Sequence, residues 1–315
     1  MSLTRRAVLP ILGSIPFTRW PIEIVPQEKP KSTRILFGGD VMLSRSVGRM
    51  AREHGDPAAP MRDVAPMFSA ADIAFANLES PFSDRGRIMD QGMVFKAEPD
   101  MISGLQLAGI DVVSTANNHA RDCGGHGVEY TLDWLELHGI AAAGTGRSED
   151  AAHAGAIVER NGVRFGFLGY TYDQSNGNHT DIDDRVAVLD FARMRQDVAA
   201  MLKRAHVAIV SMHAGLEYTP KPNPQQVSFA RAAIDAGARI VVGHHPHVVQ
   251  PWERYKGGVI FYSLGNLVFD QFQRAETQRG ALGQVVFSGK SLARAEMIPV
   301  NIVKSVPRLA ATSIV

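Results

Sequence analysis

Five short apolar segments set the pattern of this chain, and each ends in a carboxylate, an amide or a histidine. Short runs rich in β-branched residues that stop at glycine or polar residues are typical of buried strands. The segments with their polar ends occupy residues 34–40, 72–79, 111–119, 207–213 and 239–247. Helical patterns follow at residues 41–54, 128–138, 191–204 and 228–237. Alternating strands and helices predict an α/β fold rather than segregated strands and helices.

The polar ends of these segments supply six predicted metal ligands. In α/β sheets, ligands bind outside the carboxyl ends of the strands. One sheet edge is therefore predicted to carry Asp40, Glu79, Asn118, His213, His245 and His247. Asn117 is an alternative to Asn118, because the two amides are adjacent. Carboxylates combined with neutral imidazoles suit divalent Mn, Fe or Zn.

The fifth segment ends in Gly243-His244-His245-Pro246-His247. In extended backbone, His245 and His247 point the same way, whereas His244 points outward or lies behind the ligands. Pro246 disfavours a helical conformation at His245. The alternative interpretation is a surface turn, or a set of hydrogen-bonded buried histidines.

The same residues predict a hydrolytic site with two ions. One carboxylate such as Glu79 can bridge two ions about 3.5–4 Å apart, as in two-metal phosphatases and nucleases. His119, beside Asn118, is then available as a general acid.

Further strands are predicted at residues 163–171 and 258–266, and a hairpin around residues 288–291 joins strands 283–287 and 293–300. With no repeat or low-complexity tract, residues 34–315 are predicted to form a single domain. The single cysteine, Cys123, excludes an intrachain disulfide and a zinc ribbon.

Composition and motifs exclude some partners. The chain has 33 Lys and Arg residues against 32 Asp and Glu residues and no basic stripe, so nucleic acid is not an expected partner. Residues 289–291 lack the first glycine of a phosphate-binding loop, and residues 144–149 lack the third glycine of a dinucleotide-binding motif. No nucleotide site is therefore predicted.

Residues 1–33 are predicted to be a signal-like segment and linker. Arg5 and Arg6 precede a mostly apolar stretch, residues 7–17, which is too short to span a bilayer. This pattern favours export to the periplasm or cell surface, by a signal of the twin-arginine type. A disordered start or a mobile apolar arm is the alternative.

Six ordered motifs between residues 34 and 270 resemble the CapA-like family of capsule (poly-γ-glutamate) synthesis proteins. This family lies within the calcineurin-like metallophosphoesterases. The motifs are Gly39-Asp40, Asn77-Leu78-Glu79, Asn117-Asn118-His119-x-x-Asp122-x-Gly124, His213-Ala214-Gly215-x-Glu217-Tyr218, His245-Pro246-His247-Val248 and Tyr262-Ser263-Leu264-Gly265-Asn266.

The resemblance implies a four-layer α/β/β/α sandwich with two mixed β-sheets. It implies one ion held by Asp40, Glu79 and His247, and a second ion held by Glu79, Asn118, His213 and His245. It also implies that His119 is the general acid.

The chain departs from the wider superfamily at several of these positions. Met42 stands where the first motif usually has histidine, and Glu79 stands where aspartate is usual. Ala120 replaces the carboxylate that normally orients the catalytic histidine, and Asp122 is the predicted substitute. Ala214 stands where the capsule family often has tryptophan.

The function expected from these observations is that of an exported, divalent-metal-dependent hydrolase acting on phosphoesters through metal-bound hydroxide. The substrate is expected to be an anionic small molecule or polymer. One alternative is hydrolysis of an amide or γ-glutamyl bond. Another is a non-catalytic, polymer-binding subunit of a membrane-associated capsule-synthesis complex.

Overall fold

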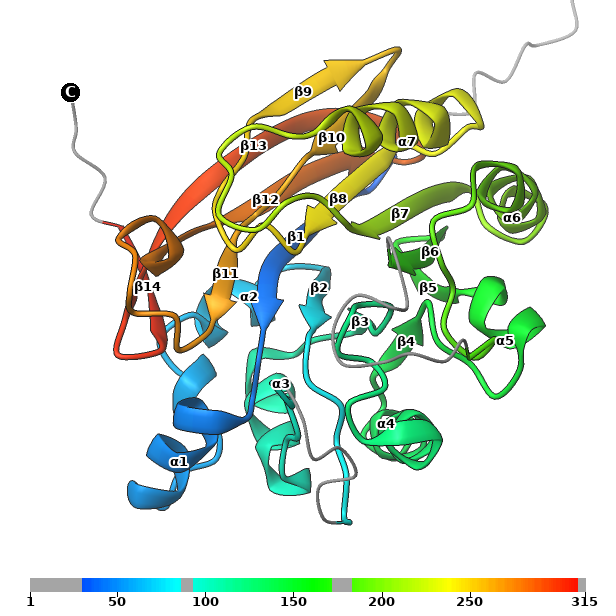
Figure 1. The fold of residues 1–315 in the computed structure, drawn as a ribbon. Helices are drawn as coiled ribbons and strands as arrows, with labels where there is room; N and C mark the ends of the chain where they lie inside the picture. The colour runs from blue at the N-terminus through cyan, green and yellow to red at the C-terminus, as the bar shows by residue number, and fades with distance from the viewer. Residues whose placement is uncertain (1–29, 86–92, 172–182, 311–315) are drawn as a thin grey trace, which may run out of the picture. The chain divides into compact units, whose positions relative to one another are not determined.

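The predicted strands, together with four strands that the sequence did not predict, form two mixed β-sheets in the computed structural model, which describes residues 30–85, 93–171 and 183–310 (Figure 1). The first sheet has the strand order β14-β13-β12-β1-β2-β3-β4, and β11 also pairs with β1. Its strands are β1 (Ser32–Val41), β2 (Ile73–Leu78), β3 (Val112–Ser114), β4 (Ala141–Ala143), β11 (Asn266–Val268), β12 (Arg279–Ser288), β13 (Ser291–Val303) and β14 (Val306–Leu309). Strands β1 to β4 are parallel, whereas β12, β13 and β14 are antiparallel.

The second sheet has the strand order β5-β6-β7-β8-β10-β9. Its strands are β5 (Ala156–Arg160), β6 (Val163–Thr171), β7 (Val207–His213), β8 (Ile240–His244), β9 (Trp252–Tyr255) and β10 (Gly258–Phe261). The central strands β6, β7, β8 and β10 are parallel, and the edge strands β5 and β9 are antiparallel to their neighbours. The carboxyl ends of β7 and β8 therefore lie together.

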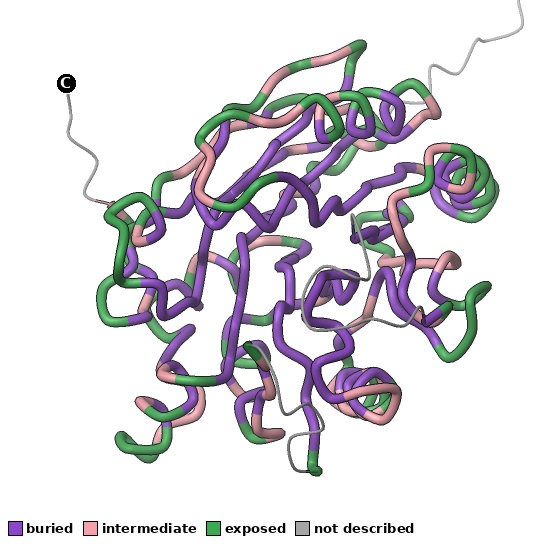
Figure 2. The backbone as a smooth tube through the Cα atoms, viewed as in Figure 1, coloured by how far each residue is buried: buried purple, intermediate pink, exposed green. Residues whose placement is uncertain are grey.

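Successive side chains of the central strands enter different cores, because both faces of each sheet are covered. Phe37 and Phe75 from the first sheet pack against Phe167 and Ile209 from the second. Leu36 of β1 points the opposite way, into the core beneath the helices of the first sheet. Figure 2 shows β1, β2, β7 and β8 buried along most of their lengths.

Helices complete the outer layers. The first sheet is covered by α1 (Arg45–Glu53), α2 (Ala65–Ser69), α3 (Ile102–Ala108) and α4 (Gly124–Leu137), with the short helices η1 (Ala59–Met61) and η2 (Pro99–Met101). The second sheet is covered by α5 (Glu149–Ala154), α6 (Phe191–Arg204) and α7 (Pro224–Asp235). A further short helix, η3 (Glu276–Gln278), precedes β12. The expected α/β/β/α arrangement with two mixed sheets is confirmed.

Several predicted elements differ from the structure; helices α4 and α7, for example, each begin four residues before the predicted start. Helix α1 begins at Arg45 rather than at residue 41, because Val41 pairs with Val268 and the Met42 amide donates to the Val268 carbonyl at 2.9 Å. The predicted strand at residues 258–266 is divided between the two sheets, as β10 and β11. The late hairpin is longer than predicted, since β12 and β13 pair along ten register positions.

Two glycines allow the chain to approach itself closely beside the predicted site. An added Cβ at Gly39 would lie 2.0 Å from the Gly265 carbonyl oxygen, and one at Gly243 would lie 1.9 Å from the Tyr262 oxygen. Only glycine fits at these two positions. The segment that leaves β10 therefore packs directly against the ends of β1 and β8.

The predicted signal-like residues 1–29 lie outside the described residues. Within residues 30–85, 93–171 and 183–310, no helix is long and apolar enough to cross a membrane.

Candidate metal centre

Both sheets contribute side chains to one cluster. Asp40 lies near the end of β1, Glu79 directly follows β2, and His213 ends β7. Asn118 follows β3, and His245 and His247 follow β8. One ligand atom from each of Asp40, Glu79 and His247 lies within 4.8 Å of the others. These three residues are the set that the family resemblance implied for the first ion.

Asp40 is fully buried and surrounded by donors. Its Oδ1 accepts a hydrogen bond from Asn77 Nδ2 at 2.8 Å, and its Oδ2 accepts one from the His245 backbone N–H at 3.2 Å. Burial by itself raises the pKa of Asp40. Hydrogen bonds and attraction from the rings of His244 and His247 outweigh that effect and hold the pKa well below its ordinary value. Asp40 is therefore an anionic oxygen donor at neutral pH.

Glu79 is the opposite case, a fully buried carboxylate without a hydrogen-bond donor among the described residues. Its nearest ion-pair partners are His247 Nε2 at 3.7 Å and His213 Nε2 at 3.9 Å from Oε1. Burial, followed by repulsion from Asp40, raises its pKa well above the ordinary value. A buried carboxylate left without donors is unfavourable, and a bound cation removes that penalty.

The separations around Glu79 fit a metal ion. Two donors that bind one zinc ion at about 2.0–2.2 Å each can lie no more than roughly 4.4 Å apart. The distances of 3.7 and 3.9 Å from Glu79 to His247 and His213 satisfy this limit. The residues present are therefore compatible with a divalent cation.

The histidines of the second predicted set are held neutral. Burial, followed by repulsion from His245, lowers the pKa of His213 well below its ordinary value. Burial and then His247 lower the pKa of His245 to about 3. Neutral imidazole is the form that binds metals. His213 Nε2 also lies 2.8 Å from Asn118 Oδ1, so these two predicted ligands are adjacent.

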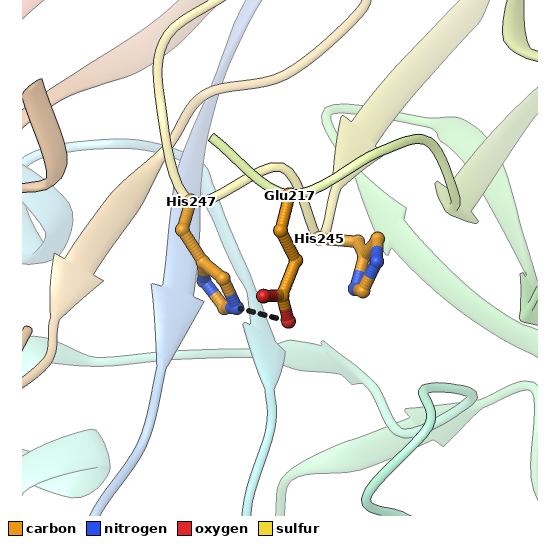
Figure 3. A group of neighbouring side chains, drawn as sticks. All are labelled: Glu217, His245 and His247. Carbon is orange, nitrogen blue, oxygen red and sulfur yellow. Dashed lines mark ion pairs between the residues drawn. The ribbon is translucent and has the colours of Figure 1, made fainter. Parts of the chain in front are cut away.

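Glu217 is an acidic residue of the cluster that the sequence did not single out as a ligand. It lies in the loop after β7, and Figure 3 shows its carboxylate between the rings of His245 and His247. The structure groups His245 with Glu217 and His247, whereas the resemblance assigned His245 and His247 to different ions. The sequence signal that could have identified Glu217 was its position four residues after His213, in the same motif.

His245 and His247 reach the site by a different geometry from the extended backbone predicted. Strand β8 ends at His244, and the φ angles of His245 and His247 are 95° and 58°. The His245 N–H turns toward Asp40 and donates to its carboxylate. His247 Nδ1 donates to Asn266 Oδ1 at 2.9 Å, which leaves Nε2 directed toward the carboxylates.

The prediction that His244 could point outward is wrong. The residue is fully buried, and its ring contacts Phe75 with centroids 6.2 Å apart. It shares the face of β8 that carries Ile240 and Val242, which points into the core between the sheets. His244 Nδ1 lies 3.4 Å from Asp40 Oδ1, so His244 lies behind a ligand, the other position expected for it.

A second constellation forms around His119. Its Nδ1 lies 2.7 Å from Asp122 Oδ2, the residue predicted to orient it in place of Ala120. The Phe95 backbone N–H donates to the same Asp122 oxygen at 2.6 Å. The Phe95 ring stacks on the imidazole with centroids 3.8 Å apart. Phe95 was not predicted, because stacking on a distant histidine leaves no local sequence pattern.

The remaining residues singled out from the sequence make contacts that stabilise the fold around the cluster. Met42 is buried, and its sulfur accepts hydrogen bonds from the Ser44 backbone and hydroxyl. Asn117 donates to the Leu78 carbonyl at 2.8 Å, and of the two adjacent amides it is Asn118 that contacts His213. Cys123 is buried, and burial followed by the charge of Asp122 raises its pKa to about 11.

Comparisons with known proteins show the family of this chain. Residues 34–271 match the family described as bacterial capsule synthesis protein PGA_cap. The PGA biosynthesis protein CapA of Bacillus subtilis (strain 168) is 34% identical over 290 residues, which is 90% of this chain and 76% of that protein. The capsule biosynthesis protein CapA of Bacillus anthracis is 30% identical over 300 residues, which is 91% of this chain and 71% of that protein.

A solved structure shows the same fold. The NAD nucleotidase of Haemophilus influenzae superposes with a TM-score of 0.51 at 10% sequence identity. The match covers 90% of this chain and 54% of the nucleotidase, so the chain spans about half of that protein. At this level of identity the likeness concerns the fold alone.

Proposed function

Because this chain belongs to the bacterial capsule synthesis protein family PGA_cap and has a metallophosphoesterase-like fold, we propose that it is a divalent-metal-dependent phosphoesterase. The observation that carries the proposal is the buried Glu79 carboxylate, whose Oε1 lies 3.9 Å from His213 Nε2 and 3.7 Å from His247 Nε2. No described donor satisfies this carboxylate by a hydrogen bond. A cation shared with these imidazoles accounts for the whole arrangement.

In the proposed centre, Glu79 is shared by two metal ions. Asp40, Glu79 and His247 would hold one ion, and Glu79, Asn118 and His213 would hold a second, with His245 beside them. The mixture of oxygen and imidazole nitrogen donors suits Mn, Fe or Zn. Bound ions of this type lower the pKa of a coordinated water and stabilise negative charge at the attacked centre.

His119 is proposed as the general acid. Its Nδ1 is occupied by Asp122, so Nε2 is the ring nitrogen available to give a proton to the leaving oxygen. The Phe95 ring fixes the plane of the imidazole by stacking on it. Positioning of this kind keeps the acid in one orientation relative to the bound substrate.

A second candidate role follows from the relatives, which are described as biosynthesis proteins for PGA or capsule. In that case the centre would bind an anionic polymer, or cleave its γ-glutamyl bonds, as part of a membrane-associated synthesis complex. Arg5, Arg6 and the apolar residues 7–17 support export, which either role can use.

The test begins with the metal content of the purified full chain after loading with Mn, Zn or Fe. Each form is then assayed with p-nitrophenyl phosphate and with poly-γ-glutamate. Metal-dependent release of p-nitrophenol supports the phosphoesterase. Cleavage of poly-γ-glutamate alone would favour amide hydrolysis over the phosphoesterase activity. Metal binding without either activity would favour the polymer-binding role.

A matched pair of histidine variants controls this test. His213→Ala removes a proposed ligand of the second ion, so it should lower the metal content and abolish activity. His54→Ala removes an exposed histidine whose ring contacts the Met50 carbonyl, and it should change neither. Failure of the wild type to bind any of the three metals would refute the centre.

A further inference from the structure

We propose that Glu217 is a ligand of the metal centre and supplies the donor that the first motif lacks at Met42. This inference rests on the proposed metal centre and extends it, since neither the sequence motifs nor the relatives' descriptions give Glu217 a role. With Glu217 as a ligand, the loop after β7 becomes part of the metal centre.

The carboxylate position is the first reason. Glu217 Oε1 lies 4.0 Å from His247 Nε2, and the same nitrogen lies 3.7 Å from Glu79 Oε1. His247 Nε2 therefore lies near two carboxylate oxygens, one from the residue that follows β2 and one from the loop after β7. Both separations fall within the limit of roughly 4.4 Å for two donors on one ion.

His247 is oriented for this arrangement. Its Nδ1–H donates to Asn266, so the lone pair of Nε2 faces Glu79 and Glu217. Figure 3 shows the Glu217 side chain extended toward this nitrogen and the His245 ring on its other side. The three ligand atoms of Glu217, His245 and His247 lie within 4.8 Å of one another.

Two backbone hydrogen bonds and one from a side chain fix the loop that carries Glu217 over the histidine segment. The Ala214 N–H donates to the His244 carbonyl at 3.1 Å, and the Tyr218 N–H donates to the Pro246 carbonyl at 2.8 Å. Gln250 Nε2 donates to the Thr219 carbonyl at 2.9 Å. Glu217 is thus held on both sides, although its side chain remains 44% exposed.

Met42 cannot fill the role itself. Its sulfur is occupied by the Ser44 amide at 3.2 Å and the Ser44 hydroxyl at 3.1 Å, and the side chain is fully buried in the core beneath α1. A thioether is also a soft donor that suits Cu(I) better than Mn or Zn. A carboxylate from another loop restores a hard donor to the centre.

The experiment measures metal binding rather than turnover. Glu217→Gln keeps the shape of the side chain and removes its charge, and Glu276→Gln is the control because Glu276 is exposed on η3. Both variants and the wild type are titrated with Mn²⁺ by calorimetry. The same proteins are loaded with Co²⁺, and their visible absorption spectra report the ligand set.

The Gln variant is expected to bind at least one ion about tenfold or more weakly and to change the Co²⁺ spectrum, whereas the control matches the wild type. Wild-type affinity and spectrum in Glu217→Gln would overturn the assignment. If His213→Ala loses metal while Glu217→Gln retains it, the centre stands and only the role of Glu217 fails. If the wild type itself binds no metal, both proposals fail together.

Discussion

Burial of several ionisable side chains in this cluster is unfavourable in the metal-free protein, and a shared cation would offset its cost. Glu79 is buried without hydrogen-bond donors, and His213 and His245 are buried in their neutral forms. A divalent cation binds these forms of imidazole and carboxylate directly. Each of the three residues is therefore explained by metal binding better than by the stability of the metal-free protein.

Replacing Glu79 by glutamine is expected to stabilise the metal-free protein and to abolish metal binding. Because the pKa of Glu79 is raised, its contribution to stability is present at low pH and is lost as the pH rises above the ordinary value of 4.5. Glutamine does not ionise, so the variant should gain about 1–3 kcal/mol over the wild type at pH 8 and less at pH 5. Urea unfolding in the presence of a chelator measures both differences. A wild type more stable than the variant at pH 8 would contradict the explanation.

Asp122→Asn is expected to reduce turnover without loss of metal. The substitution weakens the contact that orients His119, so kcat should fall by about 10²–10⁴-fold with little change in KM. Asp184→Asn, at an exposed position, serves as the matched control and should retain wild-type kcat. Kinetics and metal content measured on the same samples separate the two effects. Equal loss of metal and activity would assign Asp122 a structural role.

At the scale of elements, strand ends rather than helices carry the centre. Strands β1 and β8 each end just after a glycine that another backbone segment approaches closely. These contacts hold the segment between β10 and β11 against both strands. This packing places Asn266, the first residue of β11, within hydrogen-bond distance of His247. The ligand geometry therefore depends on how closely the strands approach one another.

Gly243→Ala is expected to destabilise the protein by about 3 kcal/mol or more, because the new methyl group would overlap the Tyr262 carbonyl. The displaced β8 should also release metal. Gly104→Ala is the matched control, since its Cβ would lie 3.2 Å from Cγ of the flexible Met61 side chain and at an ordinary contact distance of 3.7 Å from the Pro57 carbonyl oxygen. Urea unfolding and metal content test both variants. Near-wild-type stability of Gly243→Ala would show that β8 and β10 can move apart without loss of folding stability.

At the scale of the whole folded unit, the proposed metal centre takes its ligands from both sheets. Asp40, Glu79 and Asn118 come from the first sheet, and His213 and His245 come from the second. The apolar core between the sheets, including Phe37 and Phe75, lies beneath them. Metal binding at the proposed centre would therefore be linked to the packing of one sheet on the other.

Metal is accordingly expected to raise the melting temperature of the whole unit. Free metal at about 100 times its Kd stabilises the folded state by about 2.7 kcal/mol, or about 5 °C for a domain of this size. His213→Ala should show a smaller shift in melting temperature, whereas His54→Ala should shift as the wild type does. Calorimetry with and without a chelator measures the change. A melting temperature independent of metal would contradict the link.

The sequence by itself determined the α/β class, the two late hairpin strands and the strand ends at which Asp40, Glu79 and His213 lie. These features follow from local periodicity and from the rule that ligands gather at the carboxyl ends of strands. The positions of Phe95 and Glu217, the buried face of His244 and the turned backbone of His245 were decided only by the tertiary structure. Each depends on contacts between segments far apart in the chain, such as Asp40 with the His245 amide, and local sequence patterns do not encode such contacts.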